Sequence, residues 1–97
     1  MLMAKKTVKF TQDAIEKLPK NLPVVYIISS ETEVLYVGTA KRGRVRERLN
    51  EHLSTGPDPI QGGSKVQIEQ MQSIGDAEKK ETRLIAERKP PQNKQGK

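Results

Sequence analysis

The chain has 97 residues, enough for one domain with a modest core, because folding at this length buries only about 60 to 65% of the unfolded surface. Hydrophobic residues make up 33% and aromatic residues 3%, so the core must consist mainly of valine, isoleucine and leucine. The absence of cysteine excludes disulfides and cysteine-bound zinc. Lys and Arg number 18 against 12 acids, and this basic balance is typical of proteins that bind polyanions such as nucleic acids.

Targeting features are missing from the sequence. The first residues lack the apolar stretch of a secretory signal, and the longest apolar run, residues 24–28, is far too short to span a bilayer. We therefore expect a cytoplasmic protein with no membrane partner.

The N-terminal segment, residues 1–22, is expected to consist of a basic stretch and a short helix that lays an apolar edge on the sheet. Residues 1–10 are basic and carry no periodic pattern, so we expect them to be frayed or lightly docked. Thr11 has the character of a helix N-cap, and apolar residues follow it at helical spacing until Pro19 ends the helix.

A hairpin opens the expected core, residues 23–93. We expect residues 24–28 and 34–37 to form strands, and the simplest antiparallel register across a turn at residues 29–33 sets Tyr26 directly opposite Tyr36. These are the only tyrosines of the chain. Gly38 is expected to end the second strand, where backbone bends sharply or lets a ligand come close.

A basic loop at residues 39–43 leads into an expected helix over residues 44–53. Its apolar stripe is Val45, Leu49 and Leu53, which must face the sheet. Arg44, Arg48 and His52 form the neighbouring stripe at the same spacing.

The second half of the chain predicts a loop, a strand and a helix. Residues 54–64 consist of turn-forming residues and are expected to be exposed, and residues 65–71 alternate weakly as a third strand. Asp76 is expected to cap a helix that ends near Arg88, before a polar tail at residues 94–97. Glu81 lies within the apolar stripe of that helix, so its carboxylate should have a cation or a set of donors as partner.

Together these residues resemble the GIY-YIG nuclease domain. The resemblance rests on five motifs in order, with the segments Val24-Val25-Tyr26, Tyr36-Val37-Gly38, Arg48-Leu49 with His52-Leu53, Glu81 with Leu84-Ile85, and Lys89-Pro90 with Asn93. It covers residues 23–93 and implies a small α+β fold, in which helices flank a three-stranded antiparallel sheet. It also implies hydrolysis of phosphodiester bonds with one divalent metal ion.

The resemblance also assigns roles to individual residues. Tyr26 and Tyr36 would be the paired active-site tyrosines, one of them helping to deprotonate the attacking water. Arg48 would hold the scissile phosphate, Glu81 would bind the metal, and Asn93 would steady the site. His52 matches a histidine that is common in the family but not uniform in role.

Some positions depart from the family pattern or leave a choice open. Val24 stands where the first motif usually has glycine, and Thr39 stands where the nucleotide-excision repair nucleases of the family carry lysine. The loop before Arg48 is two residues longer than in those enzymes, so Arg46 is a rival for the arginine role. The expected nucleic-acid contacts come from the end of the second strand, the loop and the start of the helix, namely Gly38, Thr39, Lys41, Arg42, Arg44 and Arg46.

Phosphodiester hydrolysis explains why these residue types would occur together. An arginine offers bidentate donors to phosphate oxygens, and one carboxylate can hold Mg²⁺ or Mn²⁺ completed by waters and phosphate oxygens. A free tyrosine has a pKa near 10, so it is a poor base at neutral pH unless cations favour its phenolate.

The sequence therefore predicts a metal-dependent endonuclease that acts on DNA with low sequence specificity or with structure selectivity. One alternative is a non-catalytic nucleic-acid-binding module of the same fold, and another is an RNA-directed nuclease. No groove-reading motif is appended, so sequence-specific cutting would need the loop, the basic helix or a DNA-recognition partner protein. The oligomeric state is left open.

Overall fold

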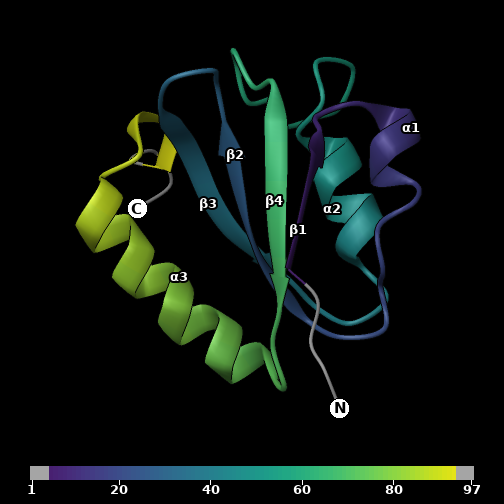
Figure 1. Ribbon diagram of the computed structural model, residues 1–97, viewed down its shortest axis with the longest axis vertical. Helices are drawn as coiled ribbons and strands as arrows, with labels where there is room; N and C mark the ends of the chain where they lie inside the picture. The colour runs from purple at the N-terminus through teal and green to yellow at the C-terminus, as the bar shows by residue number, and fades with distance from the viewer. Residues whose placement is uncertain (1–4, 94–97) are drawn as a thin grey trace.

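The computed structural model describes residues 5–93, which form an antiparallel sheet with helices on both faces (Figure 1). The predictions made for residues 1–4 and for the polar tail at residues 94–97 lie outside the described residues. The elements, in chain order, are β1 (Lys5–Lys9), α1 (Gln12–Ile15), β2 (Val24–Ser29), β3 (Val34–Ala40), α2 (Val45–Glu51), β4 (Lys65–Gln70), α3 (Ile74–Arg88) and the 3₁₀ turn η1 (Pro91–Asn93).

The sheet has four strands in the order β1-β4-β2-β3, so the prediction of three strands was wrong. The additional strand is β1, which pairs antiparallel with β4 over five residues from Lys5 opposite Glu69 to Lys9 opposite Lys65. The burial pattern of β1 explains why the strand was not predicted from the sequence. Only Val8 turns toward the core, and the other β1 residues are exposed. The expectation that this segment is frayed or lightly docked is therefore corrected for residues 5–9.

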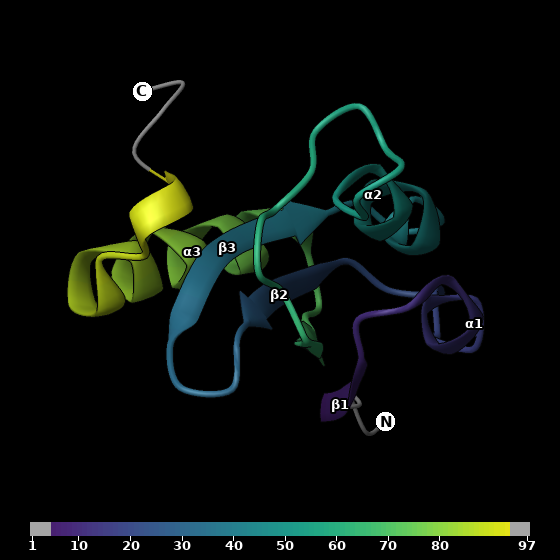
Figure 2. The ribbon, with the colours of Figure 1, turned by 90° about the horizontal axis from the view of Figure 1, so that it is seen from above.

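The two faces of the sheet carry different layers of the core. Even-numbered residues of β2 and β4 pack with α1 and α2 in the larger cluster, which includes Ile15, Leu18 and Leu49. Val25 of β2 and Val37 of β3 pack against Leu84 of α3 in the smaller cluster. Figure 2 shows α3 on one side of the sheet and the pair α1 and α2 on the other.

The hairpin register differs from the expected one. Tyr26 pairs with Gly38, and Tyr36 pairs with Ile28, so the two tyrosines are not directly opposite each other. Two local features cause the shift. Ser29 pairs with Val34 across a shorter turn that Ser30 stabilises, and a β-bulge follows between Ile28 and Ser29. Each feature moves the register by one residue, so together they leave both tyrosines on the same face of the sheet.

The helices begin and end for reasons that are largely local. Thr11 caps α1 as predicted, because its hydroxyl accepts from the Ala14 backbone N–H. The N-cap of α3 is Ser73 and not Asp76, since the Ser73 hydroxyl accepts from the Asp76 N–H. Asp76 instead places its charge in the first turn of the helix, where it complements the dipole. Lys89 ends α3 in a left-handed conformation with a φ of 49°.

The segment at residues 54–64 is only partly the exposed loop that we expected. Ile60 is buried in the larger core cluster, and Gly63 lies so close to Phe10 and Ile28 that any side chain there would collide with them. Gly38 does not end β3, which continues to Ala40. In the part of the chain that the structure describes, no helix is both long and apolar enough to cross a membrane.

Candidate active site

The tyrosine cluster, which we define as Tyr26, Tyr36 and His52, lies between the sheet and α2. The ring centroids are 6.3 Å apart for the two tyrosines, 5.6 Å for Tyr26 and His52, and 4.9 Å for Tyr36 and His52. Strands β2 and β3 supply the tyrosines, and the end of α2 supplies the histidine. The two tyrosine rings therefore pack together on one face of the sheet, as predicted, although the strand register differs from the predicted one.

Gly38 makes room for the ring of Tyr26. A Cβ atom at position 38 would lie 2.5 Å from the Tyr26 hydroxyl oxygen and 2.6 Å from the ring carbon that carries it. This glycine faces Tyr26 across the β2–β3 ladder, so its role in the free chain is to admit a buried side chain. Its φ lies outside the left-handed region, and the close approach alone explains the residue.

Both ring nitrogens of His52 are hydrogen-bonded, and the partners fix the tautomer. Nδ1 lies 2.9 Å from the Asp58 carbonyl oxygen, which can only accept, so Nδ1 carries the proton. Nε2 lies 2.8 Å from the Tyr26 hydroxyl and must accept the phenolic proton. Burial lowers the pKa of His52, which keeps the imidazole neutral in this arrangement. Its ring is fully buried.

The two tyrosines differ in access to solvent. Tyr26 is 0% exposed, and burial raises its pKa, with further increases from Tyr36 and Glu81 and an opposing effect of Arg48. Tyr36 is half-buried, and burial raises its pKa as well, while Arg48 lowers it and Glu81 raises it. Both phenols are therefore protonated at neutral pH in the free chain. Tyr36 is the one that an incoming molecule can reach.

Arg48 is the arginine at the tyrosine cluster. Its charge acts on the pKa values of both phenols, and its Nη1 donates to Glu51 Oε1 at 2.6 Å. The side chain is 35% exposed, so part of the guanidinium remains accessible. Arg46 points elsewhere, because its Nε donates to the Leu18 carbonyl oxygen at 2.9 Å. Geometry thus favours Arg48 over its rival for a phosphate contact at this site.

Glu81 lies on α3, which packs on the other side of the sheet from α1 and α2. Its side chain is half-buried, and its negative charge raises the pKa of both Tyr26 and Tyr36. The charges of Arg48 and Glu81 thus act in opposite directions on the two phenols.

Asn93 contacts the backbone of β3 beside the tyrosine cluster. Its Oδ1 accepts from the Val37 N–H at 2.7 Å, and its Nδ2 donates to the Val37 carbonyl oxygen at 2.9 Å. The buried side chain thus imitates a neighbouring strand along the outer edge of β3. This position supports the predicted steadying role, because Val37 lies between Tyr36 and Gly38.

A divalent metal ion at Glu81 would have this one carboxylate as its protein ligand. Within residues 5–93, no three side chains of His, Cys, Asp or Glu lie together as a metal-binding group. His52 uses both ring nitrogens in other bonds. A single carboxylate fits the habits of Mg²⁺, which commonly keeps several waters and takes one or two carboxylates together with substrate phosphates. Glu81 fits that minimal requirement, and a zinc site does not fit.

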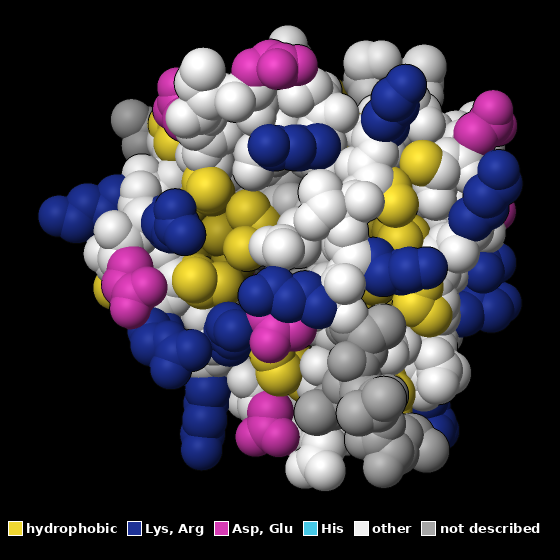
Figure 3. Space-filling model, viewed as in Figure 1, with side chains coloured by type: hydrophobic (Ala, Val, Ile, Leu, Met, Phe, Trp, Pro, Cys, Tyr) yellow, Lys and Arg dark blue, Asp and Glu magenta, His cyan; other side chains and the backbone are white. Residues whose placement is uncertain are grey.

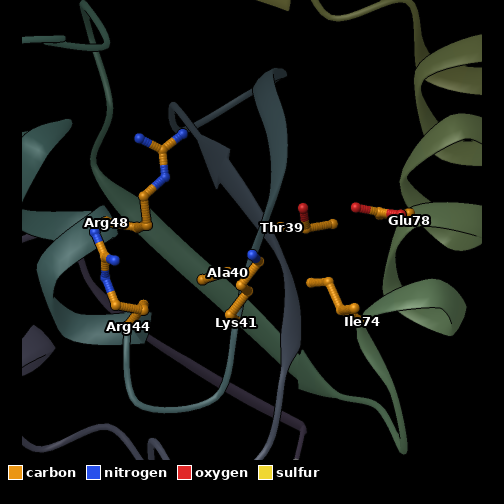
Figure 4. A pocket seen from close by; sticks show the side chains of 7 residues that line it. All are labelled: Thr39, Ala40, Lys41, Arg44, Arg48, Ile74 and Glu78. Carbon is orange, nitrogen blue, oxygen red and sulfur yellow. The ribbon is translucent and has the colours of Figure 1, made fainter.

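A pocket of about 240 Å³ lies between α2 and α3, and Arg48, whose charge acts on the tyrosine cluster, lines it. We call it the α2–α3 pocket. Figure 4 shows Arg44 and Arg48 on one side, Ile74 and Glu78 on the other, and the end of β3 between them. Its lining residues are Thr39, Ala40, Lys41, Arg44, Arg48, Ile74 and Glu78.

The predicted nucleic-acid contacts divide between this pocket and other surfaces. Thr39, Lys41 and Arg44 line it, whereas Gly38 is buried under Tyr26 and Arg46 donates to the Leu18 carbonyl oxygen in the segment after α1. Arg42 is exposed in the loop after β3. Positive charge is not confined to this region, since Figure 3 shows Lys and Arg side chains spread around an apolar area on the face seen in Figure 1. Net charge alone does not locate the site.

Two residues of the site were not foreseen from the sequence. Glu78 lies one helical turn before Glu81, so helical spacing would have identified it once Glu81 was assigned. Asp58 acts through its backbone carbonyl, and side-chain identity gives no indication of such a contact.

Comparison with known proteins adds no relative. No protein-family model, curated protein or solved structure matches this chain. The functional reading therefore depends on the motifs and on the geometry of the site.

Proposed function

We propose that this chain is a divalent-metal-dependent endonuclease that hydrolyses phosphodiester bonds in DNA and belongs with the GIY-YIG nucleases in fold and mechanism. The observations that carry the proposal are the packing of Tyr26, Tyr36 and His52 against one another and the action of the Arg48 and Glu81 charges on both phenols. A phosphodiester site needs a cation for the phosphate, a carboxylate for a metal and a group able to take a proton from water. Arg48, Glu81 and the tyrosines are residues of these chemical types.

Tyr36 is the proposed general base because it is the accessible phenol. Tyr26 is fully buried, and its hydroxyl donates a hydrogen bond to His52, so it holds the cluster in position. Tyr36 must lose its proton before it can accept one from water, and Arg48 already opposes the effect of burial on its pKa. A phosphate bound at Arg48 would lie beside this phenol.

Arg48 and Glu81 divide the remaining tasks. The Arg48 guanidinium is paired with Glu51 through Nη1, and its remaining N–H donors could bind phosphate oxygens. Glu81 would hold the metal ion, which when bound supplies Lewis-acid stabilisation of the leaving oxygen. Asn93 fixes the β3 backbone on which Tyr36 is carried.

A cleavage panel tests the proposal. Labelled duplexes, flaps, forks and single strands of DNA, with RNA strands of the same sequence, are incubated with Mg²⁺, Mn²⁺ or EDTA. We expect cutting of DNA only with metal, and a loss on the order of 10² or more in rate for Glu81→Ala and Arg48→Ala. Glu87→Gln and Arg46→Ala, which change exposed or differently engaged residues, should retain most activity.

Each outcome of the panel has a definite meaning. Cutting in EDTA that survives Glu81→Ala would overturn the metal-dependent mechanism. Salt-sensitive binding without cutting of any substrate would identify a non-catalytic binding module, and cutting of RNA alone would identify an RNA-directed nuclease. Thermal unfolding of every variant shows whether a loss of activity reflects a loss of fold.

A further inference from the structure

The α2–α3 pocket has two chemically different walls. On the α2 side, Lys41, Arg44 and Arg48 supply three cations. On the α3 side, Ile74 supplies an apolar surface, and the Glu78 carboxylate points into the pocket toward Thr39 (Figure 4). A uniformly cationic groove would suit any polyanion. The mixed lining instead indicates a ligand with an anionic part for the cations and a second part that has both an apolar surface for Ile74 and a hydrogen-bond donor for Glu78.

The cations of the pocket are available to a ligand. Lys41 is exposed and forms no ion pair with any residue in the range 5–93. Arg44 pairs with Glu47 at 2.7 Å, but both side chains are more than half exposed, and surface pairs of this kind contribute little. A phosphate can therefore replace Glu47 at Arg44. Arg44 and Arg48 are also one helical turn apart, about 6 Å along α2, so both can contact one strand.

Glu78 restricts the orientation of such a strand. An ionised carboxylate only accepts hydrogen bonds, and it repels a phosphate placed against α3. It accepts readily from a base amino group, as carboxylates do from N4 of cytosine. In a base pair N4 uses one hydrogen for the partner base and keeps the other in the major groove, so this hydrogen bond by itself does not exclude a duplex. The size of the pocket does favour an unpaired base, because about 240 Å³ has room for a single nucleotide rather than for a base pair.

We propose that the α2–α3 pocket binds one unpaired nucleotide adjacent to the cleaved phosphodiester, with its phosphate on Lys41 and Arg44 and its base against Ile74 and Glu78. The position of the cleaved bond rests on the proposed function, because it places that bond at Arg48 and Tyr36. The nucleotide-binding part stands on the lining of the pocket. The favoured substrates are accordingly strands that are unpaired next to the cutting point.

Binding measured without cleavage tests the phosphate half of the proposal. Fluorescence anisotropy in EDTA follows the full chain on short oligo-dC and oligo-dT strands over a range of salt concentrations. We expect Lys41→Ala and Arg44→Ala each to lower the slope of log K against log salt by about 0.7 on single strands. Lys79→Ala removes one exposed charge from α3 outside the pocket and is the matched control.

The base half is tested by the ratio of the two affinities. Cytosine offers an amino donor to Glu78 and thymine offers a carbonyl instead, so oligo-dC should bind about fivefold tighter than oligo-dT. The side-chain amide introduced by Glu78→Gln can both donate and accept hydrogen bonds, so this substitution should bring the ratio of oligo-dC to oligo-dT affinity close to one. Glu87→Gln, an exposed change on the same helix outside the pocket, should leave the ratio unchanged. On duplexes of the same sequences, Glu78→Gln should not alter the preference.

The results separate this proposal from the nuclease function. Equal slopes for Lys41→Ala and Lys79→Ala, or a dC-to-dT ratio that Glu78→Gln does not change, would overturn the subsite even if the chain cuts DNA. The expected slopes and ratio in a chain that cuts nothing would retain the nucleotide site and remove the nuclease. Thermal unfolding confirms that each variant is folded.

Discussion

At the scale of single residues, the clearest constraint is the contact between Gly38 and Tyr26. The motif resemblance marks Gly38 as a residue near substrate, yet in the structure it lies beneath a buried phenol. The absence of a side chain lets Tyr26 place its hydroxyl 2.8 Å from His52. One position therefore determines whether the whole tyrosine cluster can assemble.

Replacement of Gly38 by alanine should destabilise the fold. The new Cβ would meet the Tyr26 hydroxyl at 2.5 Å, so the ring must move and lose its hydrogen bond, at a cost of about 1 to 3 kcal/mol in unfolding free energy. Urea denaturation measures this change. Gly75→Ala is the matched control, because its nearest neighbour would be Ser73 Oγ at an ordinary 3.7 Å. Equal effects of the two substitutions would contradict the packing explanation.

His52 should make stability depend on pH in a definite window. Burial holds its pKa in the folded state below the ordinary value of about 6.5, so acidification protonates the unfolded chain first. The free energy of unfolding should therefore fall as the pH drops below about 6.5, with a slope of at most about 1.4 kcal/mol per pH unit. His52 is the only histidine, and carboxylates titrate mainly near pH 4.

Denaturation midpoints at several pH values between 5 and 7.5 check this expectation. The His52→Gln variant should be less stable at pH 7 and should show a much flatter pH dependence within that window. An unchanged slope in the variant would show that another group causes the effect.

At the scale of elements, local chemistry was readable from the sequence and long-range pairing was not. The helix that carries Arg48 and the helix that carries Glu81 were predicted close to their observed bounds, because apolar spacing and caps are local properties. The faces of the β2–β3 hairpin were also predicted. The register was wrong, since a bulge leaves no mark in the alternation of residues.

The candidate site shows the same division. The motifs named Tyr26, Tyr36, Arg48 and Glu81 as site residues, and in the structure the two tyrosine rings pack together while Arg48 and Glu81 shift the pKa values of both. Spacing did not reveal which tyrosine is accessible, because that depends on Gly38 and on the Asp58 carbonyl behind His52. Backbone contacts of this kind depend on the path of residues 54–64, which composition identified only as turn-rich.

At the scale of the whole molecule, the order β1-β4-β2-β3 places the two ends of the described chain on opposite edges of the sheet. Strand β1 forms one edge, and Asn93 of η1 pairs with Val37 on the other. Strand β3, which carries Tyr36, thus contacts η1 and α3, while β4 is bordered by a strand that composition alone placed outside the core. The stability of the sheet should depend on both additions.

A chain that begins at Phe10 should therefore be less stable than the full chain. It loses the five-residue pairing with β4 and the cover that Val8 gives to the core, a cost of at least about 1 kcal/mol from the apolar surface alone. Strand β4 would become an open edge, and open edges promote pairing between molecules. Urea denaturation and size-exclusion chromatography measure the two effects.

A second variant separates strand pairing from charge. Lys9→Gln keeps β1 but removes the repulsion between Lys9 and Lys65, which are directly opposite each other. Like charges in opposed positions destabilise a sheet by a few tenths of a kcal/mol to about 1 kcal/mol, so this variant should be as stable as the full chain or slightly more so. If the truncated chain instead matched the full chain in stability and remained monomeric, β1 would not be part of the cooperative fold, and the three-stranded core expected from the sequence would suffice.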